Sequence, residues 1–364
     1  MARLRDAVVV GGGPAGLAFA AAAAARGLDV LLLERRRGPV DKACGEGILP
    51  AGVEALERLG VRGRLGPAEA RPLRALRWID ASGAEARLAL PGAGGLGVRR
   101  VALEAALRAR AREAGAELRE GAEVRDHRVL ADRVRVALAG GAAAEARVLV
   151  AADGLGSPTR RRAGLERPVR APERFGVRRH AEVPDAGDAV EVHFGDGVEA
   201  YVTPVGPRQV GVAFLFERGA ARSFEALLGR FPALAARLDG AAFATPARGA
   251  GPLARAARAR VADRLVLLGD AAGYLDAVTG EGLSLAFGCA IDLAALLPGA
   301  LARGATAHDL AAYETAWRRR YGPYARWTRL VLALSRRPGL RRRLIALAAM
   351  APRPFERAVA AAVG

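Results

Sequence analysis

The hydrophobic residues near the start of the chain form two short runs separated by a longer helical segment. Residues 6–10 are an apolar run typical of a buried strand, residues 14–26 are an alanine-rich helix pattern, and residues 28–36 begin with a second apolar run. A buried strand, a helix and a second buried strand in this order predict a βαβ unit with parallel strands. The pattern therefore favours an α/β fold.

Later segments repeat these patterns and add a third. The repeated ones are a helix over 98–115, a strand over 146–154, and a strand over 263–273 followed by a helix over about 281–297. From about 172 to 217, hydrophobic and polar residues alternate between Gly and Pro, which indicates an antiparallel sheet. Residues 306–364 are predicted to be helices joined by Pro and Gly.

These patterns predict a Rossmann-like nucleotide-binding domain that is interrupted by an inserted antiparallel-sheet substrate domain. The nucleotide-binding domain is expected to comprise 1–72, 98–166 and 259–300. The substrate domain is expected to comprise 73–97 and 167–258, and a helical segment, 301–364, to follow.

Composition adds a size class and a charge to this picture. A chain of 364 residues with 52% hydrophobic content is long enough for two domains. Two cysteines make no disulfide framework, so we expect a reducing, cytoplasmic compartment. The net charge of +18 is interpreted as compositional bias, because no basic stretch is interleaved with aromatic residues, and no nucleic-acid partner is predicted.

The N-terminus has some features of a signal peptide, a basic start followed by apolar and small residues. Asp6 and three glycines interrupt its apolar run, so the strand–turn–helix interpretation is preferred. A membrane span needs ~20 apolar residues, and Arg26 and Asp29 interrupt the longest candidate. The sequence therefore predicts no signal peptide and no membrane span.

A glycine-rich loop lies between the first strand and the first helix. The loop residues singled out as a nucleotide site are Gly11, Gly13, Pro14, Ala15 and Gly16. Glycines allow a tight turn and close approach of a pyrophosphate, and the helix N-terminus offers free N–H groups. Glu34 ends the second strand, where an acid accepts hydrogen bonds from a ribose, and Arg35 follows it.

Two later motifs distinguish between nucleotide cofactors. Asp153-Gly154 and Gly269-Asp270 each end a predicted strand. With the glycine loop, in this order, they resemble the flavin-dependent oxidoreductases of the p-hydroxybenzoate hydroxylase fold over roughly residues 6–300. The resemblance implies that FAD is the cofactor, that Asp270 binds its ribityl chain and that Arg100 reaches its phosphates. It also implies that the helix after Gly282 points its N-terminus at the flavin.

Within that fold, one branch matches better than the others. The stretch Gly269–Gly282, "GDAAGYLDAVTGEG", is similar to the geranylgeranyl reductase family, which has a Gly-Glu-Gly turn like Gly280, Glu281 and Gly282. That family also has Lys-x-Cys-Gly after the second strand, here Lys42 to Gly45. The resemblance implies that this loop lies over the flavin and that Gly45 approaches the cofactor.

The side chains of this loop suggest catalytic roles. Lys42 is the only lysine in the sequence and is expected to stabilise negative charge on flavin or substrate. Cys44 is expected to position substrate or relay a proton, with a pKa lowered by Lys42. Glu46 is expected to hold Lys42 in place. Cys289, in an apolar helix, is expected to be a core residue.

The substrate stays open at this point. Prenyl reductases of the family have an aromatic-rich strand over the substrate, and here only Tyr201, among Glu199, Tyr201, Thr203 and Pro204, is aromatic. We expect Tyr201 to meet a small apolar substrate, which is a prenyl, quinone, polyketide or aromatic compound. Reduction of a C=C bond by reduced flavin is the preferred reaction, with NAD(P)H as transient electron donor.

Three alternatives were compared with this prediction. The main one is an FAD-dependent monooxygenase that hydroxylates an aromatic or polyketide substrate, and a less favoured one is a non-catalytic flavin-binding or membrane-surface protein. Flavin halogenases of the fold need a catalytic lysine in another loop, which argues against halogenation because Lys42 is the only lysine. The four histidines are scattered without metal-ligand spacing, so no metal is predicted.

The C-terminal residues mix arginine clusters with Trp, Tyr and Leu. A basic amphipathic segment of this kind either lies on an anionic membrane surface or covers the substrate domain with its arginine stems. Peripheral contact with the inner face of a membrane is therefore a hypothesis for 301–364. The sequence does not determine the oligomeric state.

Overall fold

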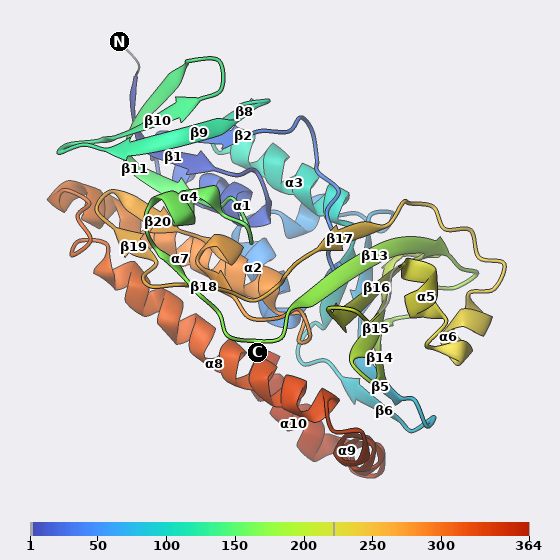
Figure 1. Cartoon of the computed structure of the whole chain (residues 1–364). Helices are drawn as coiled ribbons and strands as arrows, with labels where there is room; N and C mark the ends of the chain where they lie inside the picture. Colours follow the sequence, from blue (N-terminus) through green and yellow to red (C-terminus); the bar gives the residue numbers. More distant parts are fainter. Residues whose placement is uncertain (1–2, 221–222, 364) are drawn as a thin grey trace.

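The first layer of the protein is a mixed sheet whose central strands are parallel (Figure 1). The computed structural model describes residues 3–220 and 223–363. The sheet order is β19-β20-β11-β1-β2-β8, with β10 and β9 added as a hairpin on β11. Its strands are β1 (Leu4–Val10), β2 (Val30–Glu34), β8 (Glu117–Glu120), β9 (Val124–Val129), β10 (Val134–Leu138), β11 (Ala143–Ala151), β19 (Val261–Ala262) and β20 (Leu265–Leu267).

Parallel pairing brings the carboxyl ends of β1, β2, β11 and β20 to one edge of this sheet. The glycine loop, Glu34, Asp153 and Gly269 directly follow or end these strands. Ligands of open α/β sheets bind at this edge. The mixed α/β fold with a parallel core, predicted from the hydrophobic pattern, is confirmed.

Apolar helices cover the sheet and form the largest core. They are α1 (Pro14–Ala24), α2 (Pro50–Arg58), α3 (Arg100–Glu113) and α7 (Gly282–Arg303). Ten of the eleven residues of α1 are buried, because α3 and α7 pack against it. This explains an alanine-rich helix with almost no polar face.

The expectation that no segment is long and apolar enough to span a membrane was wrong for α7. This 22-residue helix meets both criteria. Most of it is buried against α1, α2 and α8, and its side chains belong to the main core. Its apolar length is therefore accounted for by its position as a core helix. Cys289 lies in α7 and is buried in that core, as predicted.

The second layer is a seven-stranded sheet of order β17-β13-β16-β15-β14-β5-β6. Its strands are β5 (Ala75–Asp80), β6 (Glu85–Ala89), β13 (Arg174–Glu182), β14 (Ala189–Gly195), β15 (Val198–Gly206), β16 (Gln209–Glu217) and β17 (Arg248–Ala250). All neighbouring pairs are antiparallel except β14 with β5. Residues 75–89 and 174–250 thus share one sheet, although α3 and strands β8 to β11 lie between them in the sequence.

Two small sheets join the large ones. One has the order β3-β7-β4 and the other β12-β18-β21. Their strands are β3 (Gly47–Ile48), β4 (Ala70–Leu73), β7 (Gly95–Val98), β12 (Glu166–Arg167), β18 (Arg255–Ala257) and β21 (Gly273–Tyr274). The short helices are η1 (Arg62–Arg64), α4 (Pro158–Arg162), α5 (Phe224–Leu228), α6 (Pro232–Arg237) and η2 (Gly269–Ala271). The single strand expected over 263–273 is therefore two short strands, β20 and β21, separated by η2.

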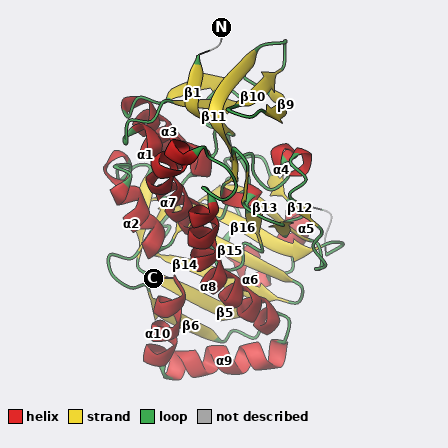
Figure 2. Ribbon diagram, turned by 90° about the vertical axis from the view of Figure 1, so that its left-hand side faces the viewer, coloured by secondary structure: helices red, strands yellow, loops and turns green. Residues whose placement is uncertain are grey.

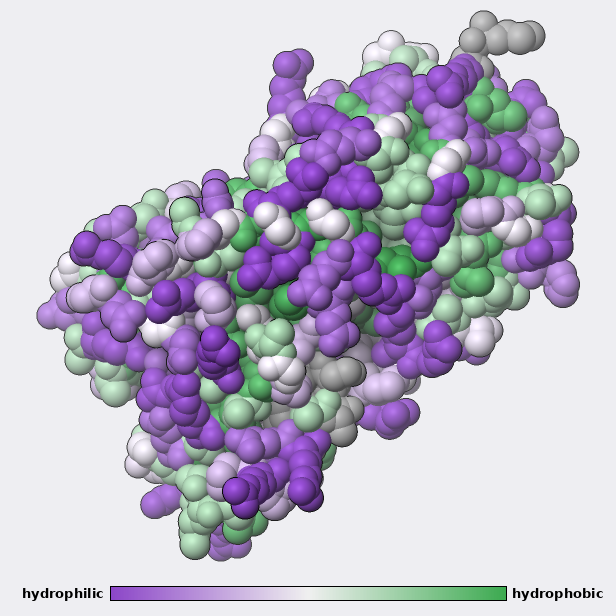
Figure 3. Space-filling model, turned by 180° about the vertical axis from the view of Figure 1, so that it is seen from behind, coloured by the Kyte–Doolittle hydropathy of each residue, from purple (hydrophilic) through white to green (hydrophobic). Residues whose placement is uncertain are grey.

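The last helices are α8 (Ala311–Ser335), α9 (Pro338–Met350) and α10 (Pro352–Val363). Figures 1 and 2 show α8 running along the molecule and α9 lying at the end beyond β5 and β6. On its inner side, α9 packs on β5 and β6 and buries Ile345 and Ala348. Figure 3 shows hydrophilic and hydrophobic atoms interspersed over the back of the molecule.

Candidate active site

The glycine loop leaves no room for side chains. A Cβ on Gly16 would lie 2.1 Å from the carbonyl oxygen of Gly11, and one on Gly11 would lie 2.4 Å from the carbonyl oxygen of Ala152. Gly11 also has a φ of 107°, which L side chains rarely adopt. The helix α1 then begins with Pro14 and has no side-chain cap. Its N-terminal N–H groups are therefore free for an anionic ligand.

Glu34 is fixed at the end of β2 by the glycine loop itself. The Gly12 N–H donates to Oε2 at 2.6 Å, and the Arg36 N–H donates to Oε1 at 2.9 Å. Both oxygens retain further lone pairs, so the carboxylate can still accept hydroxyl groups. Arg35 is exposed beside it.

One cavity of about 1140 Å³ extends from this loop to the seven-stranded sheet. Its walls include every residue singled out from the sequence except Gly16 and Glu281. Gly16 packs against the carbonyl oxygen of Gly11, where no side chain would fit. Glu281 is buried. The motifs that are scattered over the sequence therefore meet at one site.

Charged groups lie at the loop end of the cavity. Arg100 begins α3, and its Nη2 would be 3.4 Å from a Cβ on Gly13. Its Nε is buried and lacks a hydrogen-bond partner within residues 3–220 and 223–363. Burial raises the pKa of Asp270, and the charges of Arg100 and Lys42 partly oppose that rise. The site thus offers positive groups near the glycine loop.

Asp153 has a structural partner in the local chain. Its carboxylate accepts a hydrogen bond from the Ser157 hydroxyl and another from the Thr159 N–H at 3.0 Å. These bonds fix the turn from β11 into α4. Asp153 and Gly154 still line the cavity, so the prediction that they contact the cofactor stays a prediction.

The N-terminus of α7 meets the cavity from another side. The helix begins at Gly282 without a side-chain cap, and Gly280 has a φ of 72°. Behind it, Glu281 Oε2 and Ser284 Oγ are buried with no hydrogen-bond partner in the described part of the chain. Burial raises the pKa of Glu281 to about 7. A carboxyl with such a pKa is partly neutral near pH 7.

The loop that contains Lys42 and Cys44 lines the cavity. Two predictions about this loop were wrong, one about the partner of Glu46 and one about the pKa of Cys44. Glu46 does not hold Lys42: its oxygens lie 2.6 Å from His180 Nε2 and 2.8 Å from the Arg100 N–H. The pKa of Cys44 is raised, not lowered, because burial outweighs the charge of Arg100. Burial and the charge of Arg100 lower the pKa of Lys42.

Residues of β13, in the seven-stranded sheet, hold this loop in place. Arg178 donates to Asp41 and, at 3.0 Å, to the carbonyl oxygen of Lys42. Arg178 also lies 3.0 Å from His180 Nδ1. Because a guanidinium can only donate, Nδ1 accepts, and Nε2 therefore donates its proton to Glu46. We call the set Asp41, Glu46, Arg178 and His180 the loop anchor.

The loop anchor supports an unusual backbone. Glu46 has a φ of 59°, a left-handed conformation that costs about 1–2 kcal/mol for a residue with a Cβ. Its side chain is buried together with those of Arg178 and His180. The hydrogen bonds of the anchor offset this strain and keep the backbone of Cys44 and Gly45 against the cavity.

The far half of the cavity is apolar and aromatic. Trp78 of β5 and Phe194 of β14 pack edge to face, with ring centroids 6.3 Å apart, and both line the cavity with Trp327 of α8. The Tyr201 hydroxyl donates to the Val278 carbonyl oxygen at 2.9 Å. Tyr201 therefore lies at the substrate wall, but its hydroxyl is already engaged. Its predicted contact with substrate stays a prediction.

Several residues of this site could not be predicted from the sequence. The sequence offered no signal for Arg178 and His180, whose partners in the anchor are more than 130 residues away. Trp78 precedes the alternating segment by almost 100 residues, so the sequence does not indicate that the two share a sheet. The parallel pairing of β5 with β14 is what brings it beside Phe194.

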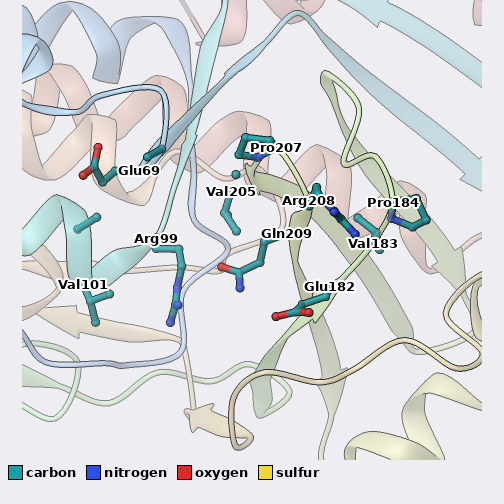
Figure 4. A pocket seen from close by; sticks show the side chains of 13 residues that line it. Glu69, Arg99, Val101, Glu182, Val183, Pro184, Val205, Pro207, Arg208 and Gln209 are labelled. Carbon is teal, nitrogen blue, oxygen red and sulfur yellow. The ribbon is translucent and has the colours of Figure 1, made fainter.

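A second cavity of about 600 Å³ shares no lining residue with the first. It lies between the start of α3 and the turn that joins β15 to β16. Figure 4 shows the polar ends of Gln209 and Glu182 directed toward the side of this cavity where Arg99 lies. The neighbouring residues Arg99 and Arg100 thus face different cavities.

The geometry of the large cavity fits FAD. The glycine loop and the two uncapped helix N-termini suit a pyrophosphate and a polar ring edge. The Arg100 Nε lies 3.6 Å from Glu104 Oε2 but makes no hydrogen bond in the described residues, so the guanidinium also suits a phosphate. Glu34 suits a ribose. These residues would hold the cofactor between the two sheets.

Comparisons with known families agree with this fit. The profile of the family described as FAD binding domain matches residues 5–325. The chain therefore belongs to the FAD binding domain family, and the predicted likeness to the geranylgeranyl reductases is confirmed. Its curated relatives include, by their names, reductases and monooxygenases.

Three curated proteins of known name are similar to this chain in sequence. Digeranylgeranylglycerophospholipid reductase 1 of Methanopyrus kandleri is 32% identical over 307 residues, 78% of each chain. Menaquinone reductase of Mycobacterium tuberculosis is 39% identical over 165 residues, 44% of this chain, and the match spans about two fifths (40%) of the relative. A 12-dehydrotetracycline 5-monooxygenase/anhydrotetracycline 6-monooxygenase of Streptomyces rimosus is 34% identical over 202 residues, 53% of this chain and 38% of the relative.

Solved structures show the same fold. A flavoprotein/dehydrogenase from Cytophaga hutchinsonii has a TM-score of 0.81 at 18% identity, covering 98% of this chain and 96% of its own. The flavin-dependent brominase Bmp2 has a TM-score of 0.84 at 18% identity, covering 98% and 92%. At this identity the likeness concerns the fold alone.

Proposed function

We propose that the protein reduces a C=C bond of an apolar prenyl or quinone compound. The main support is the position of the loop with Lys42 and Cys44, between the part of the cavity that fits FAD and the aromatic part. The reductases among the relatives act, by their names, on a prenylated lipid and on menaquinone. Reduced FAD would supply a hydride to one carbon of the double bond, while the other carbon takes a proton.

Cys44 is the proposed proton donor. Since burial raises the pKa of its thiol, the group keeps its proton at neutral pH, which a general acid requires. Lys42 lies in the same loop and remains exposed to the cavity. Its cation would stabilise negative charge that develops on a quinone oxygen or on the cofactor.

The aromatic half of the cavity would bind the substrate and exclude water. Trp78, Phe194 and Trp327 offer rigid apolar faces, and Tyr201 connects the wall to the segment before Gly282. We propose that a nicotinamide nucleotide reduces the cofactor and binds only transiently, since the sequence has no second glycine-loop dinucleotide motif and FAD would fill the first.

Hydroxylation is the second candidate. It is favoured by the aromatic walls of the cavity and by the likeness to the tetracycline monooxygenase over 202 residues. In that reaction oxygen, not the C=C bond, would consume the electrons of the cofactor.

An anaerobic experiment tests the proposal. The protein, loaded with FAD and reduced with dithionite, is mixed without oxygen with a menaquinone or with a geranylgeranylated glycerophospholipid. Return of the oxidised flavin spectrum, together with a product that stays heavier by H2 after any quinol has been reoxidised to the quinone, supports the reductase. If no candidate reoxidises the flavin without oxygen, and a hydroxylated product forms once oxygen is admitted, the reductase proposal is overturned and the monooxygenase is supported.

The loop residues are tested by substitution. Replacing Cys44 with Ala should lower the anaerobic reduction rate by about 10²-fold or more, as expected for loss of a general acid, while bound FAD is retained. Lys42→Met should lower the rate with a quinone more than with an isolated alkene. The matched control is Cys289→Ala, which removes the other cysteine from the core. Equal rates for Cys44→Ala and the control would exclude Cys44 as the proton donor.

A further inference from the structure

The exposed hydrophobic side chains of the protein concentrate on the end of α8 and on α9. Eight large hydrophobic side chains are exposed in the described residues, and four of them lie between 330 and 350. They are Leu330, Leu340, Leu347 and Met350, with exposed fractions of 49%, 41%, 51% and 84%. We call them the apolar patch. Isolated exposed leucines need no explanation, but a group on one surface does.

The geometry of α9 gives these side chains a common direction. Leu340, Arg343, Leu347 and Met350 are three, four and three residues apart, so they share one helix face. The opposite face is already fixed, because Arg341 Nε donates to Asp80 at 2.8 Å and Ile345 is buried. Because these contacts fix the rotation of the helix, the face with Leu340, Leu347 and Met350 stays exposed in the described residues.

The charge around the patch is of one sign. Residues 315–355 contain eleven arginines and no acidic residue. Four of these arginines pair with carboxylates, namely Arg318, Arg320, Arg336 and Arg341. Arg329, Arg337, Arg342 and Arg343 are exposed and have no carboxylate within 4.0 Å among the described residues.

From these observations we infer that the apolar patch and its arginines bind the surface of an anionic membrane. Apolar side chains among unpaired cations match the interface of a bilayer, where hydrocarbon lies below negative headgroups. A protein partner would have to be both apolar and acidic over the same helix. Figures 1 and 2 place α9 at one end of the molecule, and Figure 3 shows green and purple atoms mixed there.

The helix α8 contributes residues both to this surface and to the aromatic half of the cavity. Trp327 and Val331 of α8 line that cavity, while Arg329 and Leu330 between them are exposed. Resting on the proposed function, a further consequence is that the substrate is a lipid taken from the bilayer. The membrane contact itself does not require that any reaction occur.

Vesicle cosedimentation of the full chain tests the inference. We expect binding to vesicles of phosphatidylglycerol and phosphatidylcholine, weaker binding as salt increases, and little binding to phosphatidylcholine alone. Arg342→Gln with Arg343→Gln should reduce the partition coefficient about 25-fold, about fivefold for each arginine. Leu347→Ser with Met350→Ser should also reduce it. Neither pair lies in the cavity or in the FAD site.

Matched controls use the opposite end of the molecule. Val129→Ser and Arg128→Gln change exposed residues of β9 and should leave vesicle binding unchanged. Absence of binding to anionic vesicles would overturn the inference, as would equal losses in the control variants. Sedimentation velocity without lipid measures the oligomeric state. A dimer that both α9 double variants abolish would overturn the inference, because a second copy of the chain would then cover the patch. Because binding is measured without turnover, its failure is distinct from failure of the reductase proposal.

Discussion

At the scale of single residues, Glu281 is a buried carboxyl group with few polar contacts, since burial raises its pKa and only a hydrogen bond with Thr279 opposes that rise. Its Oε2 is buried without a partner in the part of the chain that the structure describes, and burial raises its pKa to about 7 from an ordinary 4.5. An acid whose pKa is raised by folding is at its most favourable when protonated. Its contribution to stability is therefore complete below pH 4.5 and is lost as the pH rises through about 7.

Replacing Glu281 with Gln should remove this pH dependence. In the wild-type protein, the free energy of unfolding should fall by an amount on the order of 3 kcal/mol as the pH rises between these two values. The Gln variant should lack that loss. Urea denaturation of the FAD-free protein across this pH range measures both, with the exposed Glu54→Gln as control. Parallel pH profiles for wild type and Glu281→Gln would contradict the assignment.

Single residues also show where the sequence was informative. Gly11, Gly16 and Glu34 could be predicted because a strand, a turn and a helix fix their geometry within 30 residues. Glu46 was assigned to the wrong partner, since proximity in the sequence pointed to Lys42. Its actual partner, His180, becomes visible only when β13 is placed against the loop.

At the scale of elements, β13 is the strand that connects the two parts of the active site. Through the loop anchor it fixes the backbone between Asp41 and Glu46, and through its pairing with β16 it belongs to the substrate sheet. The position of the proposed proton donor therefore depends on an element of the other domain. His180 is in this sense a positioning residue that need not touch substrate.

Replacing His180 with Ala should leave Glu46 without its hydrogen bond and release the loop. We expect kcat of the reductase to fall by about 10²-fold, as for small misplacements of a catalytic group, and the visible circular dichroism of bound FAD to change. His180→Gln should restore part of both signals, because its amide can donate to Glu46. His193→Ala, which removes a half-buried histidine from β14, is the control. An unchanged dichroism in His180→Ala would show that the anchor does not position the loop.

Elements differ in how well periodicity predicts them. The apolar runs and the alternating segments were assigned to the two kinds of sheet that the structure contains. Alternation of residue type did not predict burial, however, because β14 and β15 are buried on both faces. The continuous strand over 263–273 was not correct. Gly269 adopts a φ of 61° and starts a 3-10 turn there, and an apolar run alone does not reveal such a turn.

At the scale of the whole molecule, a buried ion triad holds three parts together. Arg174 of β13 donates to Glu199 of β15 at 2.6 Å and to Asp276 at 2.8 Å, and all three side chains are almost fully buried. The Tyr324 hydroxyl of α8 in turn donates to the carbonyl oxygen of Asp276 at 2.8 Å. The substrate sheet, the segment before α7 and the long helix α8 are thereby connected.

Replacing Arg174 with Leu should destabilise the protein by about 3–5 kcal/mol, because two buried carboxylates lose their cation. The control is Arg87→Leu, which breaks an exposed pair with Asp188 at 2.9 Å and should cost less than about 1 kcal/mol. Chemical denaturation at neutral pH measures both values. Similar losses in the two variants would show that the triad contributes no more than a surface ion pair.

The order of strands in the first sheet has a consequence for how the protein is made. Strand β20, residues 265–267, pairs with β11, and α7, which begins at Gly282, packs against α1. During synthesis α3 can cover one side of the apolar helix α1 early, but the side that α7 covers must wait for more than 250 further residues to be made. The nascent chain exposes the hydrophobic surface of α1 that α7 later covers, and long-range contacts of this kind form slowly. Productive synthesis should depend on chaperones that bind the first βαβ unit, and on translation that does not stall between β2 and α7.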